Sequence, residues 1–447
     1  MSTLDTVVVD TIVIGAGVSG LTAARLLRQA GQRVVVLEAR DRIGGRTCTE
    51  RSDGFISDLG ASWIHGIDGN PLASVVHDLG LETVEFTVGS YQPDGRPIAY
   101  YAPNGERLSD DAIYAFAKDV RDFSAHLTRT INASTLGSTY EQAIVRTATT
   151  LNWHTDRAER VREFLLHRAE EQYGASATAM DAHGLDDDTV DGDEVVFPNG
   201  FDQLATNLSA GLDIRLGHVV THVARSGSGA VVSASQGEFA ATRVVITLPI
   251  GVLKAEVVDF DPALPDWFTN AVSGFEMNNF EKVFLRFSTK FWDENVYAIR
   301  QQGEAGNWWH SWYDLTDLHG VPTLLTFAAG PSARDTRGWT DERISESVLH
   351  SLRGLYGDRV EDPLHVLVTR WQDDPYSRGS YAFMLPGSTP ADHDLLATPI
   401  DDVLHFAGEA TWGDDPATVT AALRSGHRAA QNILGRDLSF ALLPRPL

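Results

Sequence analysis

One stretch near the N-terminus, residues 11–46, limits the fold of this chain more than any other part of the sequence. An apolar run there leads into Gly15, Gly17 and Gly20, a helix-compatible segment follows, and a second apolar run ends at Glu38. Glycines at this spacing allow a tight turn, a close approach of the backbone to a pyrophosphate, and close packing of a helix on a strand. The pattern therefore predicts a strand–turn–helix–strand unit that binds a dinucleotide.

The turn before the predicted helix suits a phosphate group. A helix N-terminus presents unpaired backbone N–H groups and the positive end of the helix dipole. Ser19 lies in this first turn and is a candidate cofactor contact. Glu38 can accept hydrogen bonds from ribose hydroxyls, and its charge disfavours a 2′-phosphate. We expect Arg40, two residues further on, at the same end of the cofactor.

Directly after this acid, Arg42, Gly44, Gly45 and Arg46 form the motif R-x-G-G-R. The glycines allow a second close approach of the backbone, and Arg46 can donate to a phosphate. A nicotinamide-binding unit does not need this addition. With it, the stretch resembles the flavin-containing amine oxidase family, which binds FAD. The resemblance implies an α/β plus α+β protein, in which a Rossmann-like FAD-binding domain of the GR2 type is interleaved with a substrate-binding domain of mixed sheet and helices.

Other segments carry the same resemblance. Residues 60–72, GASWIHGIDGNPL, are similar to animal-type polyamine and spermine oxidases, and residues 403–434 resemble the C-terminal FAD segment of the family. Residues 199–253 resemble its second FAD-domain segment. From these segments we expect an FAD-binding domain made of residues 1–80, 195–273 and 395–447, and a substrate-binding domain made of residues 81–194 and 274–394.

The resemblance also implies roles for single residues. Lys282, in EKVFLRF, is the catalytic candidate, bonded through a water to flavin N5. The other candidate cofactor contacts are Gly60, Ala61, Ser62, Trp63, Val220 (through its backbone, to the adenine), Trp371, Gly408, Glu409, Thr418 and Val419. The candidate substrate-binding residues are His65, Tyr381 and Thr418.

Each of these roles has a plainer alternative. Lys282 is otherwise a strand lysine that faces solvent, His65 a buried neutral histidine, and any one Trp or Tyr a core residue. For the aromatic patch of residues 308–313, core packing is the better reading than a tunnel wall.

The cysteine content bears on the cofactor and on metals. Covalent flavin attachment would need a cysteine near the C-terminal segment, but the one cysteine, Cys48, lies elsewhere, so we expect non-covalent FAD. One cysteine also excludes a cysteine metal site within the chain. The acidic stretch 181–194 does not match a calcium loop, because no placement puts Gly sixth and Glu twelfth. We expect no metal.

The net charge of −25 bears on partners. Phosphate backbones require clustered Lys and Arg, so the charge argues against nucleic acid, and we expect no nucleic-acid partner. An acidic surface attracts a cationic small molecule. We find no signal peptide and no run of membrane-spanning length, and expect a cytoplasmic protein without a membrane partner, either a monomer or a homodimer.

Periodicity predicts the main elements outside the motifs. Helices are expected over residues 71–79, 112–129, 157–173, 344–356 and 418–433. Strands are expected over residues 96–101, 213–216, 219–224, 230–234, 243–248, 365–371 and within 280–292.

The resemblance implies oxidation of a polyamine or related amine. Hydride would pass from the α-carbon to flavin N5, the imine would be hydrolysed to an aldehyde, and O₂ would be reduced to H₂O₂. An L-amino-acid oxidase on the same fold is an alternative, and it would need an arginine such as Arg300 or Arg378 to bind the substrate carboxylate. Less favoured are an FAD-binding demethylase-like module that acts in a complex and an oxidase of hydrophobic rings.

Overall fold

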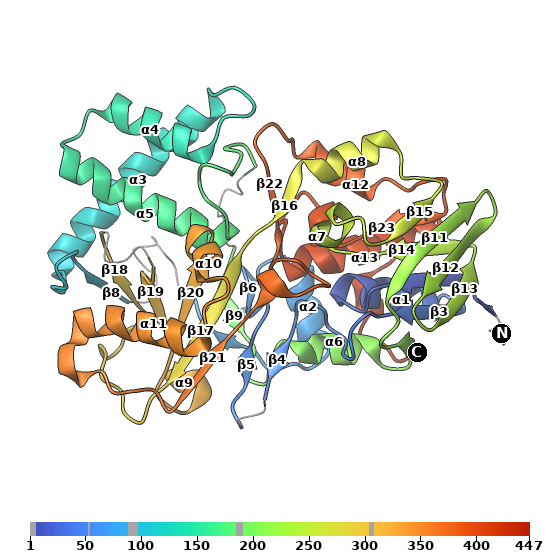
Figure 1. Cartoon of the computed structure of the whole chain (residues 1–447), viewed down its shortest axis with the longest axis horizontal. Helices are drawn as coiled ribbons and strands as arrows, with labels where there is room; N and C mark the ends of the chain where they lie inside the picture. The colour runs from blue at the N-terminus through green and yellow to red at the C-terminus, as the bar shows by residue number, and fades with distance from the viewer. Residues whose placement is uncertain (1–5, 52–53, 88–96, 185–190, 304–307) are drawn as a thin grey trace.

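The computed structural model describes residues 6–51, 54–87, 97–184, 191–303 and 308–447 (Figure 1). The glycine-rich unit forms as predicted, with β2 (Thr11–Ile14), α1 (Val18–Gln29) and β3 (Val34–Leu37). These strands belong to a parallel five-stranded sheet of order β10-β3-β2-β14-β23. The other three strands are β10 (Asp213–Arg215), β14 (Arg243–Ile246) and β23 (Leu404–Phe406).

The sheet is covered on both faces, which explains why β2 and β3 are apolar at nearly every position. On one side lie α1, α13 (Val419–Leu434) and α6 (Asp202–Ser209). Helices α1 and α13 pack closely because Gly426 has no side chain, and a Cβ there would lie 2.1 Å from the Ser19 carbonyl oxygen.

A second five-stranded sheet of order β1-β13-β12-β11-β15 shares a core with the other face. Val223 and Val232 from this sheet pack in the same cluster as Ile12 and Val35. Its strands are β1 (Val7–Val8), β11 (Val220–Ser226), β12 (Gly229–Ala234), β13 (Gly237–Ala241) and β15 (Asp259–Asp261).

The third large sheet has six strands in the order β21-β17-β20-β19-β18-β8. All neighbours are antiparallel except β18 and β8. The strands are β8 (Ile98–Tyr101), β17 (Phe280–Arg286), β18 (Ala298–Gln301), β19 (Ser311–Asp314), β20 (Thr323–Ala329) and β21 (His365–Val368).

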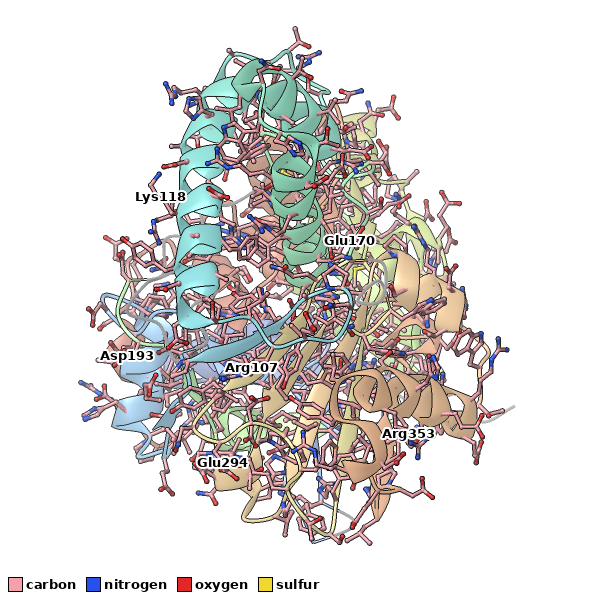
Figure 2. The ribbon with its side chains drawn as sticks, turned by 90° about the vertical axis from the view of Figure 1, so that its left-hand side faces the viewer. Arg107, Lys118, Glu170, Asp193, Glu294 and Arg353 are labelled. Carbon is pink, nitrogen blue, oxygen red and sulfur yellow. The ribbon has the colours of Figure 1, made fainter. Side chains whose placement is uncertain are left out.

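Three long helices group at one end of the molecule, at the upper left of Figure 1. They are α3 (Asp110–Asn132), α4 (Tyr140–Leu151) and α5 (Thr155–Tyr173). Figure 2 shows α3, which carries Lys118, beside α5. The C-terminal end of α5 reaches the six-stranded sheet, where it contacts β20. The helices α9 (Thr316–His319), α10 (Pro331–Thr336) and α11 (Asp341–Tyr356) also accompany this sheet.

Shorter elements connect these layers. The small sheets are formed by β4 (Thr49–Glu50) with β5 (Ser57–Asp58), by β6 (Trp63–Ile64), β9 (Val195–Val196) and β7 (Val84–Glu85), and by β16 (Phe275–Met277) with β22 (Ala382–Met384). The short helices are α2 (Pro71–Asp78), α7 (Ile250–Lys254), α8 (Asp266–Ser273) and α12 (Ala391–Ala397). The 3₁₀ turns are η2 (Gly357–Arg359), η3 (Trp371–Asp373), η4 (Glu409–Thr411) and η5 (Phe440–Leu442).

Most predicted elements are present, with differences at their ends. Asn70 caps α2 as its sequence context indicates. Helix α3 begins at Asp110, two residues earlier than predicted, because the Ser109 hydroxyl caps its N-terminus. The strand predicted over residues 365–371 stops at Val368, and Trp371 begins a 3₁₀ turn instead. The predicted domain boundaries stay a prediction.

Two properties bear on function. In the parts of the chain that the structure covers, no helix combines the length and apolar character needed to cross a membrane. Nor do the residues described there include a group of three or more His, Cys, Asp or Glu side chains suited to hold a metal ion. Part of the acidic stretch 181–194, namely residues 185–190, lies outside the described residues.

Candidate active site

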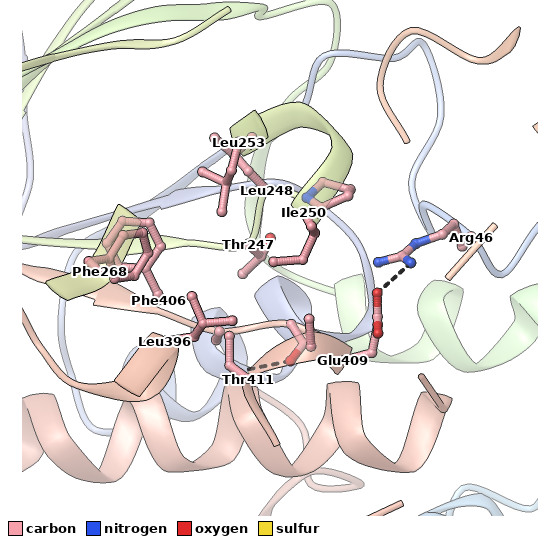
Figure 3. A pocket seen from close by; sticks show the side chains of 14 residues that line it. Arg46, Thr247, Leu248, Ile250, Leu253, Phe268, Leu396, Phe406, Glu409 and Thr411 are labelled. Carbon is pink, nitrogen blue, oxygen red and sulfur yellow. Dashed lines mark hydrogen bonds and ion pairs between the residues drawn. The ribbon is translucent and has the colours of Figure 1, made fainter. Parts of the chain in front are cut away.

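A pocket lies where the carboxyl ends of β2, β14 and β23 meet (Figure 3). Its empty volume is about 340 Å³, and Arg46, Thr247, Gly408 and Glu409 are among the residues that line it. Ligands of open parallel sheets bind at this edge, outside the carboxyl ends of the strands. The pocket is therefore at the same edge of the sheet as the glycine turn, which it meets at Thr247, whose Oγ1 lies 3.5 Å from the Gly15 carbonyl oxygen.

Each of the three glycines of the motif is needed for a different structural reason. Gly15 has φ +102°, and a Cβ there would lie 2.4 Å from Thr247 Oγ1. A Cβ on Gly20 would lie 2.0 Å from the Gly15 carbonyl oxygen, so this glycine allows α1 to pack against the turn. A Cβ on Gly17 would meet no atom within 4 Å. Gly17 thus leaves space in front of the N-terminus of α1, which has no side-chain cap.

The R-x-G-G-R loop lies directly on this turn. The Gly44 N–H donates to the Ala16 carbonyl oxygen at 2.9 Å, and Gly44 and Gly45 have φ values of +90° and +58°. The uncapped helix N-terminus and the space at Gly17 form a cradle that suits the pyrophosphate of FAD. The Ser19 hydroxyl already has a partner in the protein, because its Oγ lies 3.0 Å from Ser425 Oγ on α13.

Glu38 lies at the end of β3 with both carboxylate oxygens hydrogen-bonded. Oε2 accepts from Ala16 N at 2.7 Å and Oε1 from Arg40 N at 2.9 Å. An ionised carboxylate has further lone pairs, so a ribose hydroxyl can still bind. The His218 N–H donates to the Glu38 carbonyl oxygen, which brings the start of β11, and with it Val220, towards this end of the site. The Arg40 guanidinium pairs with Asp374 at 2.5 Å.

Glu409 provides a second test of the fit to FAD. Its Oε1 pairs with Arg46 Nη1 at 2.7 Å, as Figure 3 shows at the edge of the pocket. Its Oε2 is buried and has no hydrogen-bond partner among the residues that the structure describes. A buried carboxylate oxygen normally has a donor. A ribityl or ribose hydroxyl of FAD would supply one, so the residues present fit the cofactor.

Lys282 is buried rather than exposed to solvent, which excludes its plainer alternative. It lies on β17, and its Nζ is 2.9 Å from Asp58 O, 2.6 Å from Gly60 O and 2.6 Å from Ser62 Oγ. These three oxygens equal the number of N–H donors of an ammonium group. Lys282 therefore holds the segment 58–62, which we call the 58–62 loop. Trp63 follows this loop, and its ring centroid lies 5.6 Å from Nζ.

Burial places the titration of Lys282 within reach of neutral pH. It lowers the pKa of the amine to about 8, although the charge of Asp58 acts in the opposite direction. Burial also raises the pKa of Asp58 to about 6, while hydrogen bonds from Thr49 and Phe201 oppose the rise. When Lys282 is neutral, the Ser62 hydroxyl can donate to the amine lone pair while the two carbonyls still accept. The loop thus accommodates both protonation states.

Trp371 closes the other side of the 58–62 loop. Its indole Nε1 donates to the Leu59 carbonyl oxygen at 2.8 Å, between the two carbonyls that Lys282 holds. A Cβ on Gly60 would lie 1.8 Å from Arg46 O and 3.4 Å from the Trp371 ring, so only glycine fits. The Ala61 N–H donates to the same Arg46 carbonyl. Gly60 and Ala61 therefore connect Lys282 to the cofactor pocket.

Five aromatic rings lie next to one another beside Lys282, and three of them come from strands of the six-stranded sheet. We call Trp63, Tyr313, Phe327, Phe280 and Tyr381 the aromatic wall. Successive ring centroids in this order are 6.1, 5.2, 4.7 and 5.9 Å apart. Tyr381 stands at one end of this wall, and its predicted contact with the substrate stays a prediction. The neighbouring Trp309 and Trp312 are fully buried in the core, as the plainer alternative states.

Glu171, near the end of α5, contacts both tyrosines of this wall. Its Oε1 accepts from Tyr313 OH at 2.8 Å, and its carbonyl oxygen lies 3.5 Å from Tyr381 OH. Figure 2 shows its neighbour Glu170 at the same end of α5. Burial alone would raise the pKa of Glu171, but the charge of Arg300, 3.4 Å away, and contacts with His310 and Tyr313 lower it to about 2. The wall therefore includes one half of a buried ion pair, Glu171 with Arg300.

Three residues with predicted contacts to cofactor or substrate make other interactions in this structure. His65 is not a buried histidine, because 56% of its side chain is exposed, and its Nδ1 contacts Glu194. Thr418 caps α13, accepting from Ala421 N at 3.0 Å and donating to Asp415 O at 2.7 Å. Val419 is the first residue of that helix and is partly buried. Their predicted roles stay predictions.

Sequence reasoning missed Glu171, Tyr313 and Glu281, the buried neighbour of Lys282. Glu281 had a visible signal, since it and Lys282 are two successive charged residues between apolar ones in a strand. Glu171 had none, because acidic residues are common on helices and only the fold brings this one to the aromatic wall.

Comparisons with known proteins agree with this geometry. Residues 18–434 match the family "Flavin containing amine oxidoreductase". The "Probable polyamine oxidase 4" of Arabidopsis thaliana is 34% identical over 95% of this chain and 86% of its own length. A "Lysine-specific histone demethylase 1 homolog 1" of Oryza sativa subsp. japonica is 32% identical over 95% of this chain, but this covers only 52% of the demethylase homolog.

Solved structures share the fold over nearly the whole chain. A putrescine oxidase, solved as the wild type bound to putrescine, has a TM-score of 0.80 and 25% identity, covering 97% of this chain and 100% of its own. The glycine turn, the Arg46–Glu409 pair, the buried Lys282 and the match over residues 18–434 lead to one conclusion. The chain belongs to the flavin containing amine oxidoreductase family, and is an enzyme whose cofactor is FAD.

Proposed function

We propose that the protein oxidises a polyamine or a related amine with O₂ as the electron acceptor. When bound, FAD supplies the two-electron chemistry: hydride passes from the substrate α-carbon to N5, and reoxidation by O₂ yields H₂O₂. The resulting imine is hydrolysed to an aldehyde and a shorter amine. The names of the relatives support an amine substrate, since one is called a polyamine oxidase and another was solved with putrescine.

The buried Lys282 is the observation that carries this proposal. Its amine is fixed by three oxygens of the 58–62 loop, beside the cofactor pocket, with a pKa of about 8. A lysine in this place would stabilise negative charge on a bound flavin through its own charge and through the 58–62 loop that it holds. It can also exchange a proton near neutral pH, because both its charged and its neutral form find partners in the loop.

The aromatic wall supports a cationic substrate over an anionic one. Aromatic faces attract ammonium groups. The substrate nitrogen at the reaction centre must be neutral, whereas further ammonium groups of a polyamine can keep their charge against these rings. Glu171 is paired with Arg300 and adds no net negative charge there. The acidic surface acts in the same sense at longer range.

The L-amino-acid oxidase alternative requires an arginine to clamp a carboxylate. Arg300 is buried beside the wall, but Glu171 already neutralises its charge. Arg378, the other candidate, is exposed. Neither offers an uncompensated buried guanidinium, which disfavours this alternative.

Two further alternatives have less support. The match to the rice demethylase homolog covers only 52% of that protein. Properties that belong to its unmatched part therefore give no support to a demethylase-like module in this chain. For a hydrophobic ring substrate, the carboxylate on the aromatic wall would be a poor neighbour.

A peroxide assay tests the proposal. The purified holoenzyme is incubated with putrescine, spermidine, spermine, their acetylated forms, aromatic monoamines, leucine and phenylalanine. We expect peroxide from at least one polyamine at a higher kcat/KM than from either amino acid. Faster turnover of the amino acids would replace the proposal with the L-amino-acid oxidase, and no peroxide from any amine would end it.

A further inference from the structure

A buried carboxylate stands next to Lys282 on β17. Glu281 is 3% exposed and accepts three hydrogen bonds. Oε2 accepts from Thr369 Oγ1 at 2.5 Å and Trp371 N at 2.9 Å, and Oε1 accepts from Gln372 N at 2.8 Å. Since successive residues of a strand point to opposite faces, Glu281 and Lys282 bind different segments of the chain.

The segment that Glu281 holds is the 3₁₀ turn η3, which begins at Trp371. The Trp371 indole donates to Leu59 O, and Lys282 Nζ donates to Asp58 O and Gly60 O. Three successive carbonyls of the 58–62 loop are thus held by two side chains. One of them, Lys282, is fixed by its own strand, and the other depends on the turn that Glu281 binds.

Thr369 connects the two sides of this arrangement. Its Oγ1 donates to Glu281 and accepts from the Lys282 N–H at 2.8 Å, and its own N–H donates to the Lys282 carbonyl at 3.0 Å. After the turn, Asp374 pairs with Arg40 beside Glu38. The same turn therefore contacts both the lysine end and the nucleotide end of the site.

We propose that Glu281 is a positioning residue for amine oxidation: its carboxylate fixes the turn so that Trp371 and Lys282 together hold the 58–62 loop in place for FAD. The inference rests on the proposed roles of Lys282 and Trp371 at the flavin. Glu281 acts through Trp371 and does not itself touch the reacting atoms.

The chemistry of the three donors explains why a carboxylate is needed. An ionised carboxylate presents two acceptor oxygens and no donor, whereas the glutamine amide presents one oxygen and an NH₂ group. In Glu281→Gln, at least one of the donors Trp371 N, Gln372 N or Thr369 Oγ1 would face another donor. The substitution keeps the size of the side chain, so the change is confined to the hydrogen bonds.

A double-mutant cycle with Trp371→Phe tests the proposal. We measure the Kd of the apoprotein for FAD by flavin fluorescence, and the rate of anaerobic flavin reduction at saturating amine. Glu281→Gln should weaken FAD binding and slow reduction, each about tenfold, in the wild-type background. In the Trp371→Phe background its further effect should stay below about twofold, because residues that act through one contact are not additive.

Three variants guard against a merely structural effect. Asp293→Asn alters a partly buried carboxylate, which accepts from Tyr101, Tyr356 and Arg107, and it should lower the Tm while leaving Kd and the reduction rate unchanged. Thr369→Val should follow Glu281→Gln, and Thr369→Ser, which keeps the hydroxyl, should behave like the wild type. These threonine variants decide the question if Glu281→Gln does not fold.

Additive effects of Glu281→Gln and Trp371→Phe would overturn the proposal. So would changes in Kd and rate that Asp293→Asn reproduces at an equal loss of Tm. If the wild type oxidises no amine, the proposed function fails, but the cycle on the Kd for FAD still tests the positioning role.

Discussion

The cofactor pocket and the surroundings of Lys282 use different chemical groups of the chain. At the carboxyl ends of β2, β14 and β23, the chain offers backbone N–H groups and space left by missing side chains, as at Gly17. Around Lys282 it offers side chains: an amine, indoles, phenols and the carboxylate of Glu171. Backbone features come from short contiguous motifs, whereas this set of side chains comes from segments that only the fold brings together. The cofactor pocket should tolerate no change of shape, and the surroundings of Lys282 no change of charge.

The largest effect is expected at the glycine turn. Gly20→Val should prevent recovery of folded holoenzyme, because even a Cβ would lie 2.0 Å from the Gly15 carbonyl oxygen. Gly17→Ala is the matched control, since its Cβ meets no protein atom. It should leave the Tm of the apoprotein unchanged and weaken FAD binding at least about tenfold, by contact with the pyrophosphate. Unchanged FAD affinity in Gly17→Ala would show that the cradle is not a phosphate site.

The next largest effect is expected at Lys282. Lys282→Met should slow anaerobic flavin reduction or reoxidation by about 100-fold, within the usual range for a positioned proton-transfer group. Lys290→Met is the control, because this lysine pairs with Asp314 and Glu294 away from the 58–62 loop. Stopped-flow absorbance separates the two half-reactions. Wild-type rates for both in Lys282→Met would remove this residue from the mechanism.

A third prediction concerns the charge of the aromatic wall. Glu171→Gln leaves Arg300 buried without its counter-charge and should lower the free energy of unfolding by about 4 kcal/mol. It should also raise KM for diamines more than KM for monoamines. Glu170→Gln, at the adjacent position, is the control. Adding Arg300→Met to Glu171→Gln should restore stability, and a double variant no more stable than the single one would contradict the buried pair.

The smallest effect is a pH dependence. The folded state holds Lys282 with a pKa of about 8, below its ordinary value of 10.5. Between these values the unfolded chain binds more protons, so stability rises with pH, by about 3 kcal/mol in total. Urea unfolding of the apoprotein at pH 7.5 and pH 10.5 measures the rise. The rise in unfolding free energy should be present in the wild type and absent in Lys282→Met. The same pH dependence in both proteins would contradict the lowered pKa of Lys282.

The contrast between these two regions also explains what the sequence could predict. Gly15, Gly17, Gly20 and Glu38 could be assigned because their spacing is local and each residue type has a steric or hydrogen-bonding reason. The Arg46–Glu409 pair could be expected only through resemblance, since the two residues are far apart in the chain. Lys282 was found in the same way.

The partners of these residues could not be predicted. Nothing in the periodicity of α5 distinguishes Glu171 from the other acids of that helix. The exposure of His65 and the capping role of Thr418 likewise depend on neighbours that are remote in sequence or on loop geometry. Local pattern therefore predicts the scaffold of the cofactor site, while the substrate side requires the assembled structure.

The packing of α13 against α1 also sets an order of events during synthesis. β2 and β3 emerge from the ribosome first, but Gly408, Glu409 and Gly426 follow only near the end of the chain. At about 5–20 residues per second, the glycine turn waits on the order of tens of seconds for them. Until β14 (Arg243–Ile246) has been synthesised, one edge of β2 has no neighbour, and its apolar strand is exposed to other chains. Because Gly408 and Glu409 line the pocket, the cofactor site is complete only when nearly the whole chain has been made.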